Sequence, residues 1–335
     1  MQQLNPSLIL KGGAAAQLHM EGSAQRSSRD IDIVTPLSLK EVNEVLSHLQ
    51  AKFAGTSLEI KPYLPPKARV PELPMVTYDV FFESVLPRAK GFTRDFIKID
   101  IISEDVKLPV TAIRAKDTPV FTVKNARCVS LGALSADKLQ TLASKTIGTT
   151  IDDVPKQLYD IDHLLFGNPA SIDVVKHMMY AYNTLAKQEL KFKKRKESPI
   201  DVLDDIVDTL AGLALVDIEG NKEFKKSTRD FQAQYLRKES VLNVYGWGER
   251  VSRIKFLCLL LKQALEDKIN EREFVDHITK ASEISTKLPA SDKVLEARLV
   301  ELIKPKGRVF RGKPLRRIFW HAVTPTNLYD LPVSS

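Results

Sequence analysis

Short apolar runs with the character of β-strands recur through the first 130 residues of the chain. They are rich in β-branched and aromatic residues and are bounded by glycine, proline and polar residues, which predicts strands. These runs cover residues 8–10, 30–33, 76–85, 96–102 and 119–129. Ser38 and Glu41 form a capping-box pair, and the apolar residues that follow recur at helical spacing, so a helix is expected there. A proline-rich passage from Pro62 to Pro74 predicts a loop.

After about residue 130 the apolar pattern changes to helical spacing. Helices are expected from Ser135, from Pro155 to Leu165, after the N-cap Ser171, from Pro199 behind the N-cap Ser198, and from Arg253 to Leu265. Because the strands of the first part lack regular helical crossovers, they are expected to form a mixed sheet. The sequence therefore predicts an α+β fold, with a mixed β-sheet and flanking helices in residues 1–130 and a mostly α-helical domain in residues 131–335.

Two glycines follow the first predicted strand and open a helix. Backbone N–H groups at a helix N-terminus attract phosphate, and Gly12 and Gly13 leave those groups accessible. Asp30 and Asp32 are two apart on the next predicted strand, so both carboxylates leave the same face and can hold a divalent metal. A glycine pair alone usually marks a turn, and an Asp-x-Asp pair often lies on a solvated strand face. Their order within one strand–helix–strand unit favours a phosphate and metal site, as nucleotidyl transfer requires.

Four charged residues in later segments complete this candidate site. Asp100 lies in an otherwise apolar strand, where an unpaired buried carboxylate is costly, so it is a candidate third metal ligand or base. The alternative is a partly exposed acid on an edge strand. Lys138 and Lys145 are seven apart and are expected to share one face of the helix that starts at Ser135. Asp160, on the next helix, could orient Lys138, whose charge would neutralise a triphosphate. Taken alone, these residues are also typical of an ordinary charged helix face.

A net charge of +8 and an isoelectric point of about 9.2 favour a polyanionic partner. Two basic runs concentrate this charge, and RNA contacts are expected from Lys193, Lys194 and Arg195 in the first and from Arg311, Lys313, Arg316 and Arg317 in the second. Phe310, Phe319 and Trp320 lie in or after the second run, where they could stack on unpaired bases or pack on the protein body.

The length of 335 residues favours two domains. Cys128 and Cys258 lack metal-type spacing and are expected to be ordinary buried thiols. The six histidines show no ligand spacing, so no zinc site is expected. No apolar run reaches the roughly 20 residues that span a bilayer, and no signal-type segment is visible, which favours a cytoplasmic protein without a membrane partner.

The order of these motifs resembles the AbiEii/MenT group of nucleotidyltransferase-fold toxins, within the DNA-polymerase-β-like superfamily. The matching elements span roughly the first half of the chain and are Lys11-Gly12-Gly13, Arg26-x-Ser28-x-Asp30-Ile31-Asp32, Lys98-Ile99-Asp100-Ile101, Asp137-Lys138-Leu139 and Tyr159-Asp160-Ile161. The first block is shared across the superfamily, whereas the Lys-Leu and Tyr-Asp blocks point to this group in particular. Two departures are Gly12-Gly13-Ala14, which lacks a hydroxyl often found in the phosphate loop, and Lys156-Gln157, where the group often has Lys-Asp.

The resemblance implies a Mg²⁺- or Mn²⁺-dependent enzyme that transfers a nucleotide from an NTP. In related toxins the acceptor is the 3′ end of tRNA, and a cognate antitoxin restrains the activity. By position, Asp30 and Asp32 would bind metal, Ser28 would lie at the triphosphate, and Lys138 and Asp160 would belong to the active site. The full candidate set adds Asp100 as metal ligand or base, and Lys11, Gly12, Gly13, Arg26 and Lys145 at the phosphates.

In this interpretation the first domain is catalytic, and the second completes the active site and binds the acceptor. Two other interpretations stay open. The same fold could act on a small molecule, as drug-modifying adenylyltransferases do, or it could serve as a non-catalytic module that binds RNA or protein.

Overall fold

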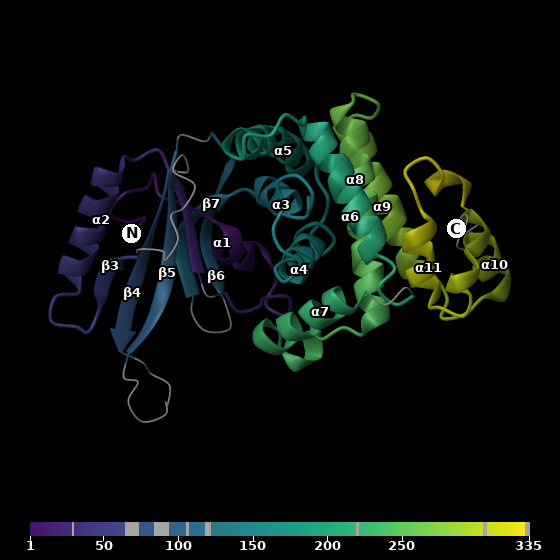
Figure 1. The fold of residues 1–335 in the computed structure, drawn as a ribbon, viewed down its shortest axis with the longest axis horizontal. Helices are drawn as coiled ribbons and strands as arrows, with labels where there is room; N and C mark the ends of the chain where they lie inside the picture. The colour runs from purple at the N-terminus through teal and green to yellow at the C-terminus, as the bar shows by residue number, and fades with distance from the viewer. Residues whose placement is uncertain are drawn as a thin grey trace. The chain divides into compact units, whose positions relative to one another are not determined.

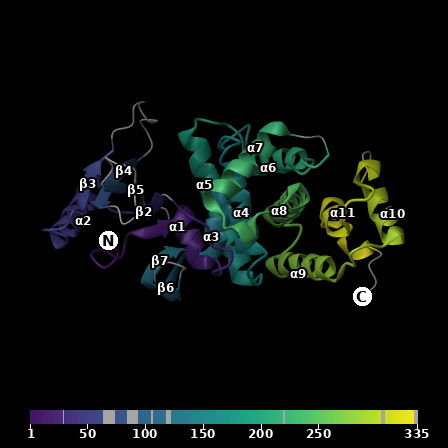
Figure 2. The ribbon, with the colours of Figure 1, turned by 90° about the horizontal axis from the view of Figure 1, so that it is seen from below.

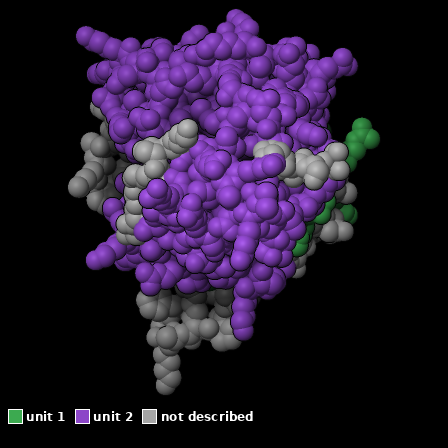
Figure 3. Space-filling view, turned by 90° about the vertical axis from the view of Figure 1, so that its right-hand side faces the viewer, with its two compact units in different colours: residues 1–134 green, residues 135–335 purple. Residues whose placement is uncertain are grey.

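The chain divides into two compact units, Met1–Leu134 and Ser135–Ser335, which Figure 3 colours separately. The structure is a computed structural model and describes residues 1–28, 30–63, 74–83, 94–104, 107–117, 122–218, 221–303 and 307–331. The division between the units falls within helix α3 (Leu131–Gln140).

A mixed sheet, seven-stranded in the described part of the chain, forms the centre of the first unit (Figure 1). The strands are β1 (Ile9–Lys11), β2 (Asp30–Thr35), β3 (Glu59–Pro62), β4 (Met75–Glu83), β5 (Arg94–Ser103), β6 (Val110–Asp117) and β7 (Thr122–Val129). Their spatial order is β3-β4-β5-β2-β1-β7-β6. β2 runs parallel to β5 and β1 parallel to β7, while the other neighbours are antiparallel. The expected mixed sheet and α+β class are confirmed.

Side-chain alternation gives the central strands one apolar face and one charged face. The buried cluster on the apolar face combines Ile33, Ile99 and Ile101 of the strands with Val42, Val45 and Leu46 of helix α2 (Leu39–Lys52). Because successive side chains of a strand point to opposite faces, Asp32 and Asp100 lie on the other face of the sheet. The apolar pattern that forms the core therefore also sets the direction of the acids.

Local sequence signals fixed the ends of several elements correctly. The backbone N–H of Ser38 donates to Glu41 Oε2 at 2.8 Å, and the Ser38 hydroxyl oxygen accepts from the backbone N–H of Glu41 at 3.3 Å, so the predicted capping box of α2 is present.

The edge strands β3 and β6 were not expected, because short and partly polar strands carry a weak periodic pattern. Residues 64–73 of the predicted proline-rich loop, and the ends of two predicted strands at 84–85 and 119–121, lie outside the described residues.

Helices make up the second unit (Figures 1 and 2). After α3 come α4 (Val154–Leu165), α5 (Ile172–Phe192), α6 (Pro199–Leu213), α7 (Lys222–Tyr235), α8 (Val244–Leu265), α9 (Glu271–Lys287), α10 (Lys293–Leu302) and α11 (Leu315–Ala322). α4, α6, α9 and α11 all contact α8, and the leucine stripe of α8 is fully buried. Helix α8 is therefore the core helix of this unit, as its leucines predicted.

Two helices begin earlier than expected, because their caps lie upstream of the strongest apolar repeat. α3 begins at Leu131 rather than Ser135, and the Ser130 hydroxyl accepts from the N–H of Ala133 at 3.3 Å. α8 begins at Val244 rather than Arg253, and the Asn243 side chain accepts from the N–H of Gly246 at 2.9 Å. Glycines in the first turns of α8 weaken the helical pattern there.

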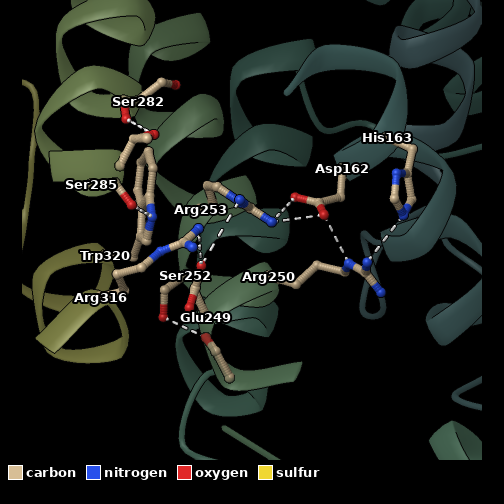
Figure 4. Close-up of polar contacts among 12 residues, drawn as sticks. Asp162, His163, Glu249, Arg250, Ser252, Arg253, Ser282, Ser285, Arg316 and Trp320 are labelled. Carbon is tan, nitrogen blue, oxygen red and sulfur yellow. Dashed lines mark hydrogen bonds and ion pairs between the residues drawn. The ribbon is translucent and has the colours of Figure 1, made fainter. Parts of the chain in front are cut away.

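A buried ion network joins α4 to α8 (Figure 4). Asp162 of α4 accepts from Arg250 Nε at 2.9 Å and from Arg253 Nη2 at 2.7 Å. Arg250 Nη2 also lies 3.3 Å from His163 Nε2. Burial alone would raise the pKa of Asp162, but the two guanidinium groups outweigh it and hold that pKa below its ordinary value. The carboxylate therefore stays ionised inside the unit and fixes the orientation of α4.

Both cysteines, Cys128 and Cys258, are buried free thiols, as expected. Among the described residues, no helix combines the length and the apolar character that a bilayer crossing needs.

The free energy of unfolding should depend on pH through two buried histidines, His163 and His321. Burial is the main cause that lowers the pKa of His163 to about 4 and that of His321 to about 3. The unfolded chain takes up these protons near pH 6.5 and the folded chain does not, so the free energy of unfolding should fall with acidification by about 1.4 kcal/mol per pH unit for each histidine. Urea denaturation between pH 7 and pH 5 measures this slope. His163→Gln should reduce the slope by about half, because His321 still contributes, and an unchanged slope in that variant would contradict the assignment.

Candidate active site

Asp32 and Asp100 are direct neighbours on two parallel strands. In the register of β2 and β5, Asp32 pairs with Asp100, and neighbouring strands lie about 4.8 Å apart. Lys11 lies opposite Asp32 on β1, and Thr77 lies opposite Asp100 on β4. The Thr77 hydroxyl donates a hydrogen bond to Asp100 Oδ1. One row across the sheet thus places an ammonium-bearing residue, two carboxylates and a hydroxyl side by side.

The position of Asp100 in the sheet excludes one alternative from the sequence. Its strand, β5, has β4 on one side and β2 on the other, so Asp100 does not lie on an edge strand. Asp30 is two residues from Asp32 on the same face of β2 and lies opposite Lys98. The three predicted acids are therefore on one face of the sheet.

The glycine pair packs directly against the other predicted site residues. A Cβ atom added to Gly12 would lie 1.8 Å from Asp32 Oδ2, and one added to Gly13 would lie 2.6 Å from Ser28 Oγ. Gly12 also has a φ of 62°, a conformation that disfavours other residues. The first turn of helix α1 (Gly12–His19) can approach these two side chains only because both positions lack a side chain.

Cationic groups surround this turn. Lys11 precedes α1, and the buried Arg26 has Nη2 3.5 Å from the position that a Cβ of Gly13 would take. Arg26 is held by hydrogen bonds from its Nη1 to the carbonyl of Ser27 at 2.7 Å and from its backbone N–H to Gln17 Oε1 at 2.7 Å. Together with the α1 N-terminus, these groups form a setting that favours an anion such as phosphate.

The carboxylates suit a hard divalent cation. Mg²⁺ is usually held by one or two carboxylates together with substrate phosphates, and Asp32 with Asp100 supplies two adjacent carboxylates beside the α1 turn. Within the described residues, no group of three or more acidic, histidine or cysteine side chains could hold a metal by itself. Two carboxylates together with substrate phosphates form a donor set that suits Mg²⁺, and a ligand role for Asp30, Asp32 and Asp100 stays a prediction.

A buried ion pair in the second unit joins two more predicted residues. Lys138 Nζ of α3 lies 2.7 Å from Asp160 Oδ2 of α4, and the two side chains are 4% and 0% exposed. Lys138 Nζ also donates to Gln157 Oε1 at 3.4 Å. Two residues along a helix are about 200° apart, so Asp160 faces Lys138 while Asp162 faces α8. The structure thus brings Lys138 and Asp160 together and fixes the position of the lysine.

Comparison with known proteins assigns the family. A family model described as "Nucleotidyl transferase AbiEii toxin, Type IV TA system" matches residues 1–240, well over half of the chain. The chain belongs to this family. No curated protein matches it. Among solved structures, a crystal structure of an antigenic nucleotidyltransferase-like protein from Paracoccidioides brasiliensis aligns with 11% identity and a TM-score of 0.35, covering 58% of this chain and 89% of that chain.

As an AbiEii-family protein, the chain is a nucleotidyltransferase of a toxin–antitoxin system, with a nucleotide substrate and an antitoxin partner. The matched residues include the row on the sheet, the glycine turn and the Lys138–Asp160 pair. The sequence resemblance to AbiEii is confirmed. The second basic run lies beyond residue 240, outside the matched residues.

Lys145 does not share a helix face with Lys138, so this prediction is wrong. Helix α3 ends at Gln140, and Lys145 lies in the turns that follow it. Its backbone N–H donates to Asp205 Oδ2 at 2.9 Å, and its exposed ammonium lies 3.5 Å from Asp208. Helical spacing cannot relate two residues once the helix has ended between them.

The first basic run is on the surface. Lys193, Lys194 and Arg195 are exposed at the end of α5. Lys193 Nζ donates to the carbonyl of Ile147 at 2.5 Å, and Arg195 Nη2 donates to the carbonyl of Lys145. These bonds hold the run beside the turns after α3, and its contact with RNA stays a prediction.

The second basic run is only partly on the surface. Arg311 is exposed, and Arg316 is half-exposed with Nη2 3.0 Å from Glu249 Oε1. Arg317 is fully buried and pairs with Asp217 at 2.9 Å, so its predicted contact with RNA is wrong. Lys313 is largely buried, with Nζ 3.8 Å from Asp217 and 4.9 Å from the Tyr245 ring centre. This ammonium is committed to packing within the unit.

The aromatic residues of this segment are core residues. Phe310 and Phe319 are 0% exposed and Trp320 is 1% exposed, so none can stack on a base. Trp320 Nε1 donates to Ser285 Oγ at 2.8 Å (Figure 4). Of the two alternatives for these aromatics, packing on the protein body is confirmed.

Sequence reasoning missed polar residues on β4 that belong to the charged face. Thr77 orients Asp100, and Asp79 lies opposite Lys98 in the next row. Asp79 Oδ1 is buried without a hydrogen-bond partner among the described residues, while Lys98 Nζ lies 3.8 Å from the ring centre of Tyr63. Alternation of Thr77 and Asp79 with the apolar residues of this strand was the signal that could have found them.

Gly12→Ala should disrupt nucleotide binding, because its methyl group would displace the Asp32 carboxylate. Gly55→Ala is the matched control, since Gly55 also has a positive φ of 86° but nothing within 4 Å of an added Cβ. Both variants should lose about 1 kcal/mol to backbone strain. Calorimetric titration with the four NTPs and Mg²⁺ should show binding in the Gly55 variant and a loss of about 100-fold or more in the Gly12 variant. Equal binding by the two variants would refute the contact.

Arg317→Met and Arg316→Met should differ in stability although the residues are adjacent. The first leaves the buried Asp217 without its closest cation, which should lower the free energy of unfolding by about 3–5 kcal/mol. The second removes a half-exposed pair and should cost about 1 kcal/mol or less. Denaturant titration compares the two, and similar losses would show that Arg317 has no such structural role.

Proposed function

We propose that this AbiEii-family enzyme transfers a nucleoside monophosphate from an NTP to the 3′ end of an RNA, with tRNA as the expected acceptor and Mg²⁺ or Mn²⁺ as cofactor. The arrangement of Gly12, Asp32 and Asp100 carries the proposal, because it sets a helix N-terminus beside two adjacent carboxylates. Transfer of this kind needs phosphate positioning and a divalent ion at the same place.

The residues of the first unit would divide the work as follows. The N–H groups of the Gly12–Gly13 turn, the Ser28 hydroxyl and the Lys11 and Arg26 cations would bind the NTP phosphates. Asp32 and Asp100, with Asp30 as a further candidate, would hold the divalent ion. The ion would stabilise charge on the reacting phosphate and lower the pKa of the attacking hydroxyl. Thr77 would fix the orientation of Asp100, which would act either as a further metal ligand or as the base that takes the proton of that hydroxyl.

The Lys138–Asp160 pair would serve the leaving group. A buried ammonium held by a carboxylate is a positive charge in a fixed position. Such a charge would stabilise the negative charge that develops on the pyrophosphate as its bond to the α-phosphate breaks. Since Asp160 holds the ammonium at 2.7 Å, its role would be to position Lys138.

An RNA acceptor is favoured over a small molecule by charge. The chain has a net charge of +8, and exposed cations remain at Lys193, Lys194 and Arg195 and at Arg311 and Arg316. A small acceptor needs no such surface, whereas a phosphodiester backbone does.

Labelling of RNA tests this function directly. Pure protein, Mg²⁺, total RNA and each α-labelled NTP in turn should give label in tRNA-sized RNA with the wild type. Asp32→Asn, which keeps the side-chain shape but removes the charge, should lower labelling by at least about 100-fold. Glu44→Gln, an exposed substitution on α2, is the control and should label normally.

The outcomes separate the alternatives. Label that depends on Asp32 and on one NTP supports an RNA nucleotidyltransferase and identifies its donor. Normal labelling by Asp32→Asn would overturn the assigned site, and no label in any RNA from any NTP would overturn the RNA acceptor.

A further inference from the structure

A pocket of about 320 Å³ lies in the second unit, and none of its lining residues is used by the proposed function. It is lined by Asp152, Asp153, Lys156, Lys226, Ser227, Asp230, Phe231, Gln234 and Tyr235. These residues come from the start of α4 and from α7, two helices that contact each other (Figure 1). The volume is within the range of sites for small organic ligands.

One wall of the pocket is aromatic and rigid. Tyr235 stacks on Phe231 with ring centres 5.7 Å apart and planes 24° apart. Phe231 is 4% exposed and contacts the Tyr159 ring at 5.6 Å. Tyr159 directly precedes Asp160, so the aromatic wall is continuous with the turn of α4 that holds Lys138. A planar ligand placed on Tyr235 would rest on a supported surface.

The polar side of the pocket consists of acids and lysines. Asp152 Oδ1 accepts from the Ser227 hydroxyl at 2.9 Å, Asp153 Oδ2 accepts from Thr149 Oγ1 at 3.2 Å, and Lys226 pairs with Asp230 at 2.7 Å. Lys156 has no ion-pair partner within the part of the chain that the structure describes. The pocket therefore offers one uncommitted ammonium together with carboxylate oxygens that can accept further hydrogen bonds.

This charge balance selects among nucleotides. Three carboxylates against two ammonium groups repel a triphosphate, which carries about four negative charges near neutral pH. A single phosphodiester carries one negative charge, so it is repelled less than a triphosphate, and Lys156 can pair with it. Carboxylates accept hydrogen bonds from ribose hydroxyls and from base amino groups, and the 2′-hydroxyl is the group that distinguishes RNA from DNA.

We infer that this pocket binds one nucleotide of the acceptor RNA, with its base on Tyr235, its phosphate at Lys156 and its sugar or base edge at the Asp152 and Asp153 carboxylates. The inference rests on the proposed RNA acceptor. Exposed cations also occur along and after α7, at Lys222, Arg229, Arg237 and Lys238, and such charges favour a polyanionic partner for this unit. The sequence pattern does not indicate this site, because neither basic run includes these residues.

Binding to bulk tRNA tests the pocket without requiring transfer. In an Asp32→Asn background, filter binding should show about 10-fold weaker tRNA binding for Tyr235→Ala, since one base–aromatic stack contributes roughly 1–3 kcal/mol. Tyr235→Phe keeps the ring and should bind like the parent. Tyr180→Ala, which removes a tyrosine that is 51% exposed on α5, is the matched control and should also bind like the parent.

The lysine gives a second, independent measurement. Lys156→Gln should weaken tRNA binding and reduce the salt slope by about one ion, whereas Lys287→Gln, an exposed lysine on α9, should leave the slope unchanged. In the active enzyme, both pocket variants should raise KM for tRNA and leave KM for the NTP unchanged. Circular dichroism of each variant checks that the helices are intact.

The failure of this inference is distinct from the failure of the proposed function. If the wild type binds and labels tRNA while Tyr235→Ala and Lys156→Gln bind it normally, the pocket assignment is wrong and the function stands. A rise in KM for the NTP alone would reassign the pocket to the donor and overturn the inference. If the wild type neither binds nor labels tRNA, the RNA acceptor falls, and the pocket assignment falls with it.

Discussion

The Gly12 backbone and the Asp32 carboxylate are so close that no side chain fits between them. This contact determines much of the first unit. Strand β2 must place Asp32 at this contact, helix α1 must begin at Gly12, and the sheet must keep the two residues at this short distance. The buried cluster under α2 supplies that rigidity, because it packs against β2 and β5 on the side opposite the acids. The core and the candidate site therefore lie on opposite faces of the same strands.

Buried carboxylates impose a comparable constraint on the second unit. Desolvating a carboxylate is costly unless cations and hydrogen bonds compensate for it, and one missing partner leaves a large penalty. Helix α4 carries two such carboxylates on opposite sides, Asp160 toward α3 and Asp162 toward α8. The ion pairs of Asp162 hold helix α4 in place. Asp160 can therefore keep Lys138 in a defined position.

Local sequence signals predicted the elements that carry the candidate site better than they predicted the surface. The glycine pair, the Asp-x-Asp strand and the capping box are short-range patterns, so no knowledge of the fold was needed to recognise them. Burial of Arg317 was not predictable in this way, because its partner Asp217 lies a hundred residues earlier in the chain. A run of cations looks the same in sequence whether it faces water or a buried acid. The register that sets Thr77 beside Asp100 likewise depends on strand pairing, which no single segment encodes.

The parallel pairing of β2 and β5 also restricts how this chain can evolve. Asp32 and Asp100 share a face because each acid is next to isoleucines whose side chains pack into the core on the other face of the sheet. A single-residue insertion or deletion inside β5 would turn Asp100 toward α2 and bring an isoleucine to the substrate side, whereas a change of two residues would restore the pattern. Among relatives, insertions and deletions within these two strands should therefore be tolerated only when they add or remove an even number of residues.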